Sequence, residues 1–319
     1  YKEFKSQISG VKSINKNGIL ITFKNDSPLM YQGVDVLQTD LNTKITIGDG
    51  GLFSQPQQTV SNADKPYEYG SSQNRLSVIN TPAGLYYVSQ NQAKIYQYGG
   101  DMLKEISQIG LKWWFTLFLP YKLLEDFPNY PWQDNPVAGI GIQSVYDNQN
   151  SILYFSKKDY KLKPIEQRPV GPVQYVPYVS TGKYKGRGDY FTVGGKGKYL
   201  IGDPTLFESA SWTISFDPKN NFWISFHDWH PDLTFPTKTT FLTSKGNTLW
   251  THNYVCDSFC NYYGTPYPFE IELPIITGQT VTTIKSIEYI LECYKRKAGS
   301  CVDQFHVLDY NFDKAVIYN

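Results

Sequence analysis

The stretch 212–232 (WTISFDPKNNFWISFHDWHPD) constrains the fold of this chain more than any other, because it has the pattern of a complete β-hairpin. Apolar and polar residues alternate from Trp212 to Phe216, which places the apolar side chains on one face of a strand. Residues 217–221 then supply aspartate, proline and asparagine, which favour tight turns. The alternation resumes from Phe222 to Phe226, so we predict a second strand that returns beside the first.

The same pattern of strand, turn and strand recurs along most of the 319 residues. Comparable hairpins are predicted at 11–23, 84–98, 140–156 and 239–252. We therefore expect an all-β fold, a β-propeller-like array of hairpins and meanders with a short helical insertion and long loops. Meanders packed as a sandwich are the alternative.

The helical insertion is predicted at 109–127, where apolar residues recur at helical spacing. Pro120 lies inside this stretch, and a proline removes a helical hydrogen bond and clashes with the preceding turn. We expect two short helices, or one kinked helix, packed on the sheets. A helix on a membrane surface is disfavoured because the stretch carries few Lys or Arg residues. No apolar run is long enough to predict a membrane-spanning segment.

Three regions are predicted from changes in composition. Residues 1–60 form N-terminal β-hairpins, and because the chain begins at Tyr1 rather than Met we expect it to be part of a longer polypeptide. Residues 61–255 form the propeller-like core, with the helical insertion near 109–127 and a basic loop at 157–198. Residues 256–319 form a C-terminal β segment, beyond which we expect the chain to continue.

The basic loop has the chain's clearest excess of positive charge. The candidate patch consists of Lys157, Lys158, Lys161, Lys163, Lys183, Lys185, Arg187, Lys196 and Lys198. Such residues attract a phosphate backbone, which would allow transient contact with double-stranded DNA. The alternative is a solvated loop that contacts neighbouring subunits, since charged runs usually face solvent.

Composition limits the function classes. Only 18% of residues are charged and the net charge is +1, so nothing in the overall balance indicates a nucleic-acid-binding protein. Aromatic residues make up 16%, which excludes a disordered chain. Tyrosine and tryptophan in repeated hairpins are also typical of sugar-binding modules. A surface glycan-binding or glycan-degrading protein is therefore retained as the alternative function.

No catalytic motif is present. The chain lacks the GxSxG elbow and the GxxxxGK[ST] loop, so we predict neither an enzyme nor a cofactor. His227, Asp228, His230 and Asp232 suggest a metal cluster at first, but adjacent strand residues point to opposite faces and a third firm ligand is not evident. We therefore predict no metal site there.

The four cysteines are Cys256, Cys260, Cys293 and Cys301. Their spacing differs from the close CxxC pairs of zinc ribbons and fingers. Buried free thiols are the leading interpretation, and a disulfide or a metal site remains the alternative.

Several short stretches resemble the tail structural proteins of crAss-like bacteriophages, known as stabilization or muzzle proteins. They are spread over roughly residues 60–319. The stretches that carry the resemblance are Tyr69-Gly70-Ser71 with Asn74-Arg75, residues 78–87, 103–107 and 112–115, residues 212–215 with 223–227, Tyr262-Tyr263-Gly264 with residues 267–272, and residues 312–319.

This resemblance implies a structural component of the virion without enzymatic activity. Proteins of this kind resemble the distal nozzle of short-tailed phages, a ring of subunits around the channel through which DNA leaves. The implied partners are a homo-oligomeric ring, other tail proteins such as portal-proximal ring proteins and tail fibres, and DNA in transit. The implied location is the virion tail, assembled in the host cytoplasm.

Two tryptophans of the 212–232 hairpin are candidate subunit contacts. Trp223 and Trp229 are predicted on its outer face. Tryptophan is enriched in the buried cores of protein interfaces, so we expect these two side chains to contact a neighbouring subunit.

Overall fold

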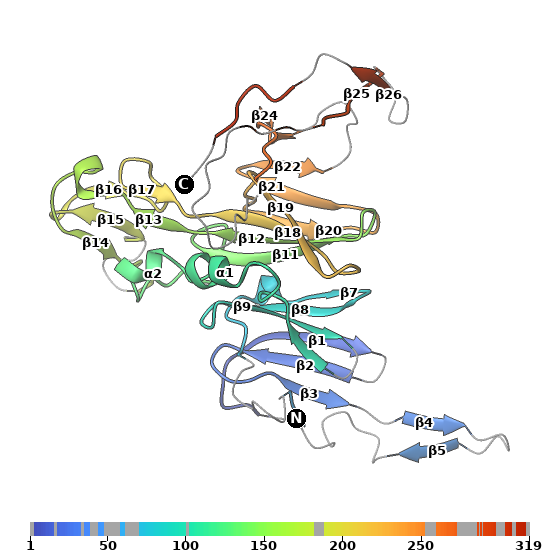
Figure 1. Cartoon of the computed structure of the whole chain (residues 1–319). Helices are drawn as coiled ribbons and strands as arrows, with labels where there is room; N and C mark the ends of the chain where they lie inside the picture. Colours follow the sequence, from blue (N-terminus) through green and yellow to red (C-terminus); the bar gives the residue numbers. More distant parts are fainter. Residues whose placement is uncertain are drawn as a thin grey trace, which may run out of the picture. The chain divides into compact units, whose positions relative to one another are not determined.

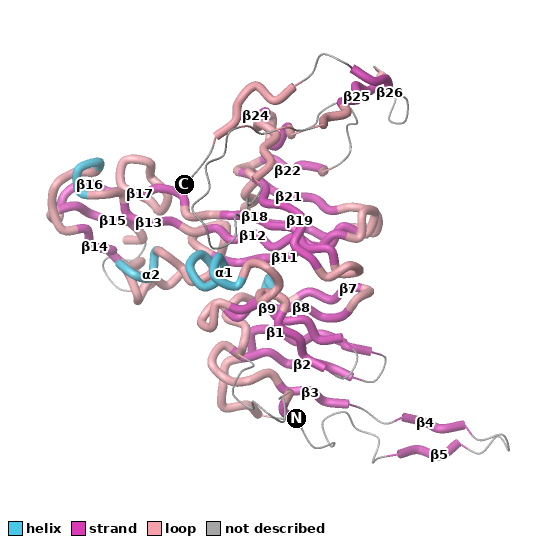
Figure 2. The backbone as a smooth tube through the Cα atoms, viewed as in Figure 1, coloured by secondary structure: helices cyan, strands magenta, loops and turns pink. Residues whose placement is uncertain are grey.

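The computed structural model describes residues 3–15, 18–32, 35–38, 44–47, 58–60, 70–99, 102–181, 188–252, 260–272, 286, 288, 290–297, 304–307 and 311–316. They fall into two compact units, Tyr1–His252 (unit 1) and Asn253–Asn319 (unit 2). Strands predominate and helix is scarce, as Figures 1 and 2 show, so the all-β prediction is confirmed. The propeller arrangement stays a prediction.

Four antiparallel sheets form the body of unit 1. The first contains β1 (Ile8–Asn15), β2 (Gly18–Phe23), β3 (Leu29–Gln32) and β6 (Gln58–Thr59). The second contains β10 (Met102–Glu105), β9 (Lys94–Gly99), β8 (Gly84–Ser89) and β7 (Ile79–Thr81). The third contains β11 (Gly141–Asp147), β12 (Ile152–Lys158), β18 (Trp212–Asp217) and β19 (Phe222–His227). The fourth contains β20 (Leu233–Pro236), β21 (Phe241–Lys245) and β22 (Thr248–Thr251).

Smaller elements complete unit 1. They are the pair β4 (Asp35–Gln38) and β5 (Lys44–Ile47), the pair β13 (Tyr160–Leu162) and β17 (Phe207–Ser209), the sheet of β14 (Val173–Val176), β15 (Tyr190–Val193) and β16 (Lys196–Tyr199), and the 3-10 turns Arg75–Ser77 and Ile165–Gln167. The prediction of a loop at 157–198 is therefore wrong, because this segment contains the end of β12 and four further strands. Its Tyr, Phe, Thr and Val residues favour strands despite the many glycines and lysines between them.

The second sheet lies between the first and the third, as the layers in Figure 1 illustrate. Successive residues of a strand point to opposite faces. Leu85 and Tyr87 of β8 pack with Leu20 of β2, whereas Tyr86 and Val88 pack with the third sheet. Because both faces of β8 are covered, its four central residues are all fully buried. Residues 1–60 thus share a core with the residues that follow and belong to unit 1.

Two turns of the third sheet are built alike. Asp147 ends β11, and its Oδ1 accepts hydrogen bonds from the backbone N–H of Gln149 (3.0 Å) and Asn150 (3.4 Å). Asp217 ends β18, and its Oδ1 accepts from the N–H of Lys219 (2.8 Å) and Asn220 (3.0 Å). Each aspartate also accepts from the side-chain amide of the asparagine three residues later. An aspartate that caps its own turn sets the register of the hairpin.

The helical insertion contains α1 (Lys112–Phe118) and α2 (Leu123–Asp126). Two short helices on either side of Pro120 are what its position predicts. Phe115 and Leu119 are buried in the core between the second and third sheets. No helix among the described residues is long and apolar enough to cross a membrane.

The described residues of unit 2 form two short strand pairs. They are β23 (Asn261–Tyr262) with β24 (Thr265–Pro266), and β25 (Cys293–Arg296) with β26 (Gln304–Val307). None of the described residues of unit 2 is buried. A two-stranded hairpin is at best marginally stable by itself in water, so the described strands of unit 2 need further contacts to be stable.

Gly84 provides a test of how closely the second sheet is packed. Its φ of +128° is strained for any residue with a side chain, and an added Cβ would lie 2.4 Å from the backbone oxygen of Tyr98. We expect Gly84→Ala to lower the free energy of unfolding by about 2–4 kcal/mol, measured by urea denaturation. Gly246→Ala is the control, because it also has a positive φ (+58°) but meets no atom within 4 Å. It should cost only about 1 kcal/mol. Equal losses would contradict the packing argument.

Candidate functional site

The predicted basic patch does not gather at one place. Lys157 lies in β12 and is 1% exposed, so its predicted position in a solvent-facing loop is wrong. Its Nζ lies 2.7 Å from Asp159 Oδ2 and donates to the carbonyl oxygens of Phe118 and Pro120. Burial lowers the pKa of Lys157, and the Asp159 carboxylate opposes that shift. Lys157 is in phase with Leu153 and Phe155 on the inner face of its strand, a signal present in the sequence.

Asp159 connects this lysine to the helical insertion. Its carboxylate accepts hydrogen bonds from the backbone N–H groups of Lys122 (2.7 Å) and Leu123 (3.3 Å), at the start of α2. Both partners of the Lys157–Asp159 ion pair are fully buried. The pair therefore fixes the segment between α1 and α2 to the third sheet rather than facing any ligand.

Three other lysines of the patch also have partners within the chain. Lys158 forms an ion pair of 2.6 Å with Asp232, and Lys161 forms one of 2.8 Å with Glu208. The Nζ of Lys163 donates to the carbonyl oxygen of Pro204. These contacts reduce the positive charge available to a phosphate backbone.

Lys196 and Lys198 remain exposed on β16. Lys198 lies over the ring of Tyr190 at 5.2 Å from its centroid, so part of its charge is directed to an aromatic face. Lys183, Lys185 and Arg187 lie outside the described residues. The role of the patch toward DNA stays a prediction, carried by fewer described residues than the sequence indicates.

Trp229 lies inside the molecule. It is 2% exposed, so its predicted placement on the outer face is wrong. Its ring packs against Tyr154 (5.4 Å between centroids), His252 (4.7 Å) and Phe241 (5.9 Å). The physical reason is that the chain folds back beyond β19, and the fourth sheet covers Trp229. That covering comes from residues 12–23 positions later, which local alternation does not predict.

Trp223 is half-buried and also packs within the chain. Its ring lies 4.8 Å from the rings of both Phe115 and Phe216. Its Nε1 donates to the carbonyl oxygen of Ile106 at 3.3 Å. Trp223 thus helps to hold α1 against the third sheet, and its part in a subunit contact stays a prediction.

The exposed apolar side chains lie beside Trp223 on β19 and on the outer side of α1. We call this set the apolar patch, and it consists of Trp113, Leu117 and Phe118 of α1 and Ile224 and Phe226 of β19. Phe222 is exposed as well, but it pairs with Asp217 and lies on the other face of the sheet from Trp223, which packs toward α1. Trp114 joins the two elements, because its ring lies 5.4 Å from Phe118 and 4.9 Å from Phe226. The sequence carries a signal for this patch, since 222–226 is apolar at four of five positions rather than at alternate ones.

Three histidines gather around Trp229. The Nε2 of His227 lies 2.9 Å from Ser215 Oγ, that of His252 lies 2.7 Å from Thr243 Oγ1, and His230 Nδ1 lies 3.5 Å from Thr213 Oγ1. Burial lowers the pKa of each of the three imidazoles to about 4. Among the described residues no group of three His, Cys, Asp or Glu side chains has the geometry of a metal site.

Cys260 is a free thiol, and Cys256 and Cys301 lie outside the described residues.

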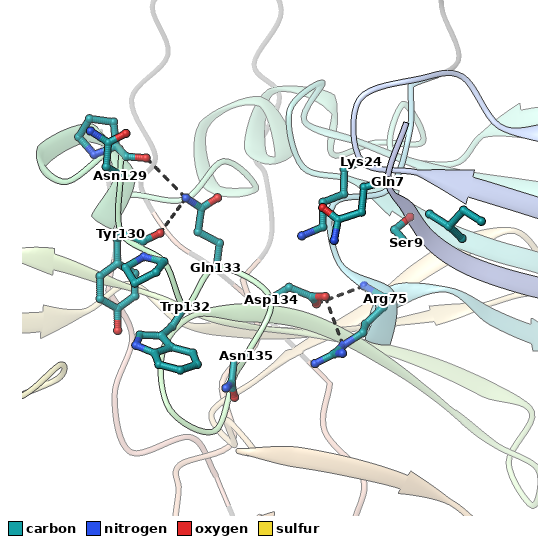
Figure 3. Close-up of a pocket in the computed structure, with 13 residues that line it drawn as sticks. Gln7, Ser9, Lys24, Arg75, Asn129, Tyr130, Trp132, Gln133, Asp134 and Asn135 are labelled. Carbon is teal, nitrogen blue, oxygen red and sulfur yellow. Dashed lines mark hydrogen bonds and ion pairs between the residues drawn. The ribbon is translucent and has the colours of Figure 1, made fainter. Parts of the chain in front are cut away.

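Figure 3 shows a polar cleft between the N-terminal strands and residues 128–135. Its volume is about 590 Å³. Asp134 lies on the wall of the cleft, and its Oδ1 accepts a hydrogen bond of 3.2 Å from the backbone N–H of Arg75. The Nε of Arg75 lies 3.3 Å from Asp134 Oδ2. Burial raises the pKa of Asp134, and Arg75 opposes that shift. Gln133 is bound to the Tyr130 carbonyl at 2.8 Å, and Trp132 donates its indole N–H to Asp189.

The lining of the cleft lacks the pair of carboxyl groups that glycoside hydrolysis ordinarily uses. Asp134 is the one carboxylate among its lining residues, all of which are described, and it is engaged by Arg75. Glycoside hydrolysis ordinarily needs two carboxyl groups that flank the bond. Amide side chains from Asn129, Gln133 and Asn135, together with Trp132, are the residue types that bind sugars.

Comparison with known proteins shows a distant sequence similarity to one phage protein. A stretch of 89 residues, 28% of the chain, is 25% identical to the muzzle protein of Bacteroides phage crAss001. The matched stretch covers 6% of that much longer protein. No protein-family model matches the chain. The chain is thus distantly similar to part of a phage muzzle protein, which agrees with the resemblance predicted from its sequence.

The buried ion pair gives a test of the structural role of Lys157. We expect Lys157→Met to lower the free energy of unfolding by about 3 kcal/mol, because it leaves the Asp159 carboxylate buried without its cation. Lys196→Met, on the exposed β16, should change it by less than about 0.5 kcal/mol. Urea denaturation measures both. If Lys157→Met is as stable as the control, Lys157 belongs to a solvated surface after all.

The three histidines predict an acid-labile fold. The unfolded histidines take up protons below a pH of about 6.5, whereas the folded ones stay neutral until about pH 4. Stability is therefore complete above pH 6.5 and falls as the pH drops toward 4, by about 1–3 kcal/mol for each histidine. Thermal melts from pH 7.5 to 4.5 measure this loss.

A comparison with His227→Gln separates the histidines from carboxylates that also titrate. The variant keeps a polar partner for Ser215 but cannot gain a proton, so its melting temperature should depend less on pH than that of the natural chain. Identical pH dependence in the two proteins would contradict the role given to His227.

Proposed function

We propose that this chain is a structural subunit of a phage virion tail, of the muzzle or nozzle type, which forms a homo-oligomeric ring around the DNA-ejection channel. The distant similarity to a phage muzzle protein is the observation that carries this proposal. The subunit stabilises the tail, contacts other tail proteins, and is assembled in the host cytoplasm. The proposal includes no catalytic activity.

The apolar patch supports assembly into a larger particle. Monomeric soluble proteins seldom leave several large apolar side chains together in water, and such patches mark interfaces. Trp113 is 78% exposed, and Phe226 is 52% exposed. A subunit surrounded by other tail proteins would cover both.

The charge distribution supports a channel through which DNA passes without being held. Affinity for DNA grows with each phosphate that a cation neutralises. The net charge is +1, and Lys157, Lys158 and Lys161 are already paired with carboxylates of the same chain. The described part of the predicted basic patch therefore offers few strong phosphate contacts, which favours transient contact over tight binding there.

Purified virions provide the test. We expect mass spectrometry to detect peptides of this chain in intact particles, and cryo-electron microscopy to place it in a ring at the distal tail. Treatment with protease at the particle surface should leave it associated with the tail. Its absence from virions would overturn the proposal.

The polar cleft favours a second candidate function, glycan binding on a surface protein. Binding to a glycan array that is reduced tenfold or more by Asn129→Ala would support it, especially if the chain is also absent from virions. Lack of binding to any glycan, together with presence in the tail, would leave the structural role as the function of the chain.

A further inference from the structure

β19 is an open edge of the third sheet. The strand order β11-β12-β18-β19 leaves one side of β19 without a neighbouring strand in the described part of the chain. An exposed sheet edge presents N–H and C=O groups that can pair with another strand. Ile224, at the irregular position of the β18–β19 ladder, is 43% exposed, and Phe222 and Phe226 on either side of it are exposed as well. The edge thus offers both hydrogen bonds and apolar contact.

The area of the apolar patch is that of an interface rather than a chance exposure. Large apolar side chains carry about 150–250 Å² each, so the exposed fractions of its five residues leave on the order of 500 Å² in water. A stable protein interface buries about 800 Å² on each partner. The patch, together with the open edge of β19, is large enough to supply most of one side.

Unit 2 also exposes large apolar side chains. It exposes Phe269 (68%), Ile271 (54%) and Ile290 (94%), and none of its described residues is buried. Residues 269–272 read Phe-Glu-Ile-Glu, which alternates as a strand with one buried face does. In the structure these four residues belong to no strand. We call residues 268–272 the arm.

The proline of the arm is placed as an added strand requires. Alternate residues of a strand direct their backbone groups to opposite sides. Pro268 has the parity of Glu270 and Glu272, so in an added strand its missing N–H falls on the same side as the backbone groups of those two residues. Phe269 and Ile271 have the other parity, and their N–H groups can pair with a sheet edge. Proline is tolerated in a strand on that outward side.

We propose that the arm of one copy adds as a strand along β19 of a neighbouring copy, with Phe269 and Ile271 against the apolar patch. Glu270 and Glu272 then lie on the opposite face, in water. Strand addition gains affinity from backbone hydrogen bonds and specificity from alternate side chains. The contact joins two different surfaces, so it can continue from copy to copy and close a ring. The inference rests on the proposed ring-forming role and names the surfaces that build it.

Single lysine substitutions on either surface test the contact. Ile224→Lys and Trp113→Lys alter the patch, and Ile271→Lys alters the arm. Lysine is a residue with which natural sheets block their edges. We expect each variant to shift the purified protein from oligomer to monomer by mass photometry, with at least a tenfold increase in dissociation constant. Val170→Lys is the matched control, because Val170 is 87% exposed outside the patch and the arm.

Mixing two defective proteins identifies which copy supplies the arm. Ile224→Lys keeps a working arm, and Ile271→Lys keeps a working patch. If the arm is exchanged between copies, an equimolar mixture forms a one-to-one dimer, although neither variant associates alone. If each arm covers the patch of its own chain, the mixture stays monomeric, and the inference is wrong.

Other outcomes separate this inference from the proposed function. Oligomers that persist in all three variants would overturn the arm contact and leave the tail role intact. A loss of oligomers with a thermal midpoint more than about 5 °C below that of the Val170→Lys protein would point to damaged folding. In that case cysteines introduced at positions 224 and 271 of separate copies should still form an intermolecular disulfide under mild oxidation, and failure to do so would overturn the contact.

Discussion

The structure of unit 1 depends on a sheet that is covered on both faces. In β8 the residues Leu85, Tyr86, Tyr87 and Val88 are all fully buried, two toward the first sheet and two toward the third. A strand with large side chains buried on both faces removes more apolar area from water than a strand buried on one face, so it contributes more hydrophobic stabilisation. It also makes the first and third sheets depend on the second, because each packs its core against it.

The buried Lys157–Asp159 pair then determines where the helical insertion lies. A desolvated ion pair is stable only if its remaining hydrogen-bonding groups are satisfied. Lys157 meets this condition with the carbonyls of Phe118 and Pro120, and Asp159 meets it with the N–H groups at the start of α2. The α1–α2 segment is thereby held over the edge of the third sheet. That position brings Trp114 against Phe226 and joins the apolar side chains of α1 to those at this end of β19.

The sequence predicts the local structure well and the burial of individual side chains poorly. Hairpins, the two capped turns at Asp147 and Asp217, and the break at Pro120 all follow from residues close to one another in the chain. The surroundings of Lys157 and Trp229 come largely from distant elements, the 118–120 segment and the fourth sheet, and for Lys157 the only local signal is its phase with Leu153 and Phe155. Lysine in a strand usually marks its exposed face, and here a carboxylate two residues later reverses that rule. The cleft of Figure 3 likewise joins residues 7–9 to 128–135, a distance in sequence that no periodicity spans.

The edge strand β19 exposes three large apolar side chains, Phe222, Ile224 and Phe226. Natural sheets protect their edges with lysines and other charges. The edge strands β1, β10 and β16 carry Lys12, Lys104 and Lys196, whereas residues 222–226 of β19 carry no charge, as is also true of the edge strands β7, β14 and β22. An unprotected apolar edge is an aggregation hazard for a protein that remains monomeric. In a subunit of a closed assembly the same edge would be covered by a neighbouring copy, and the lysines on β1, β10 and β16 would disfavour pairing at those edges.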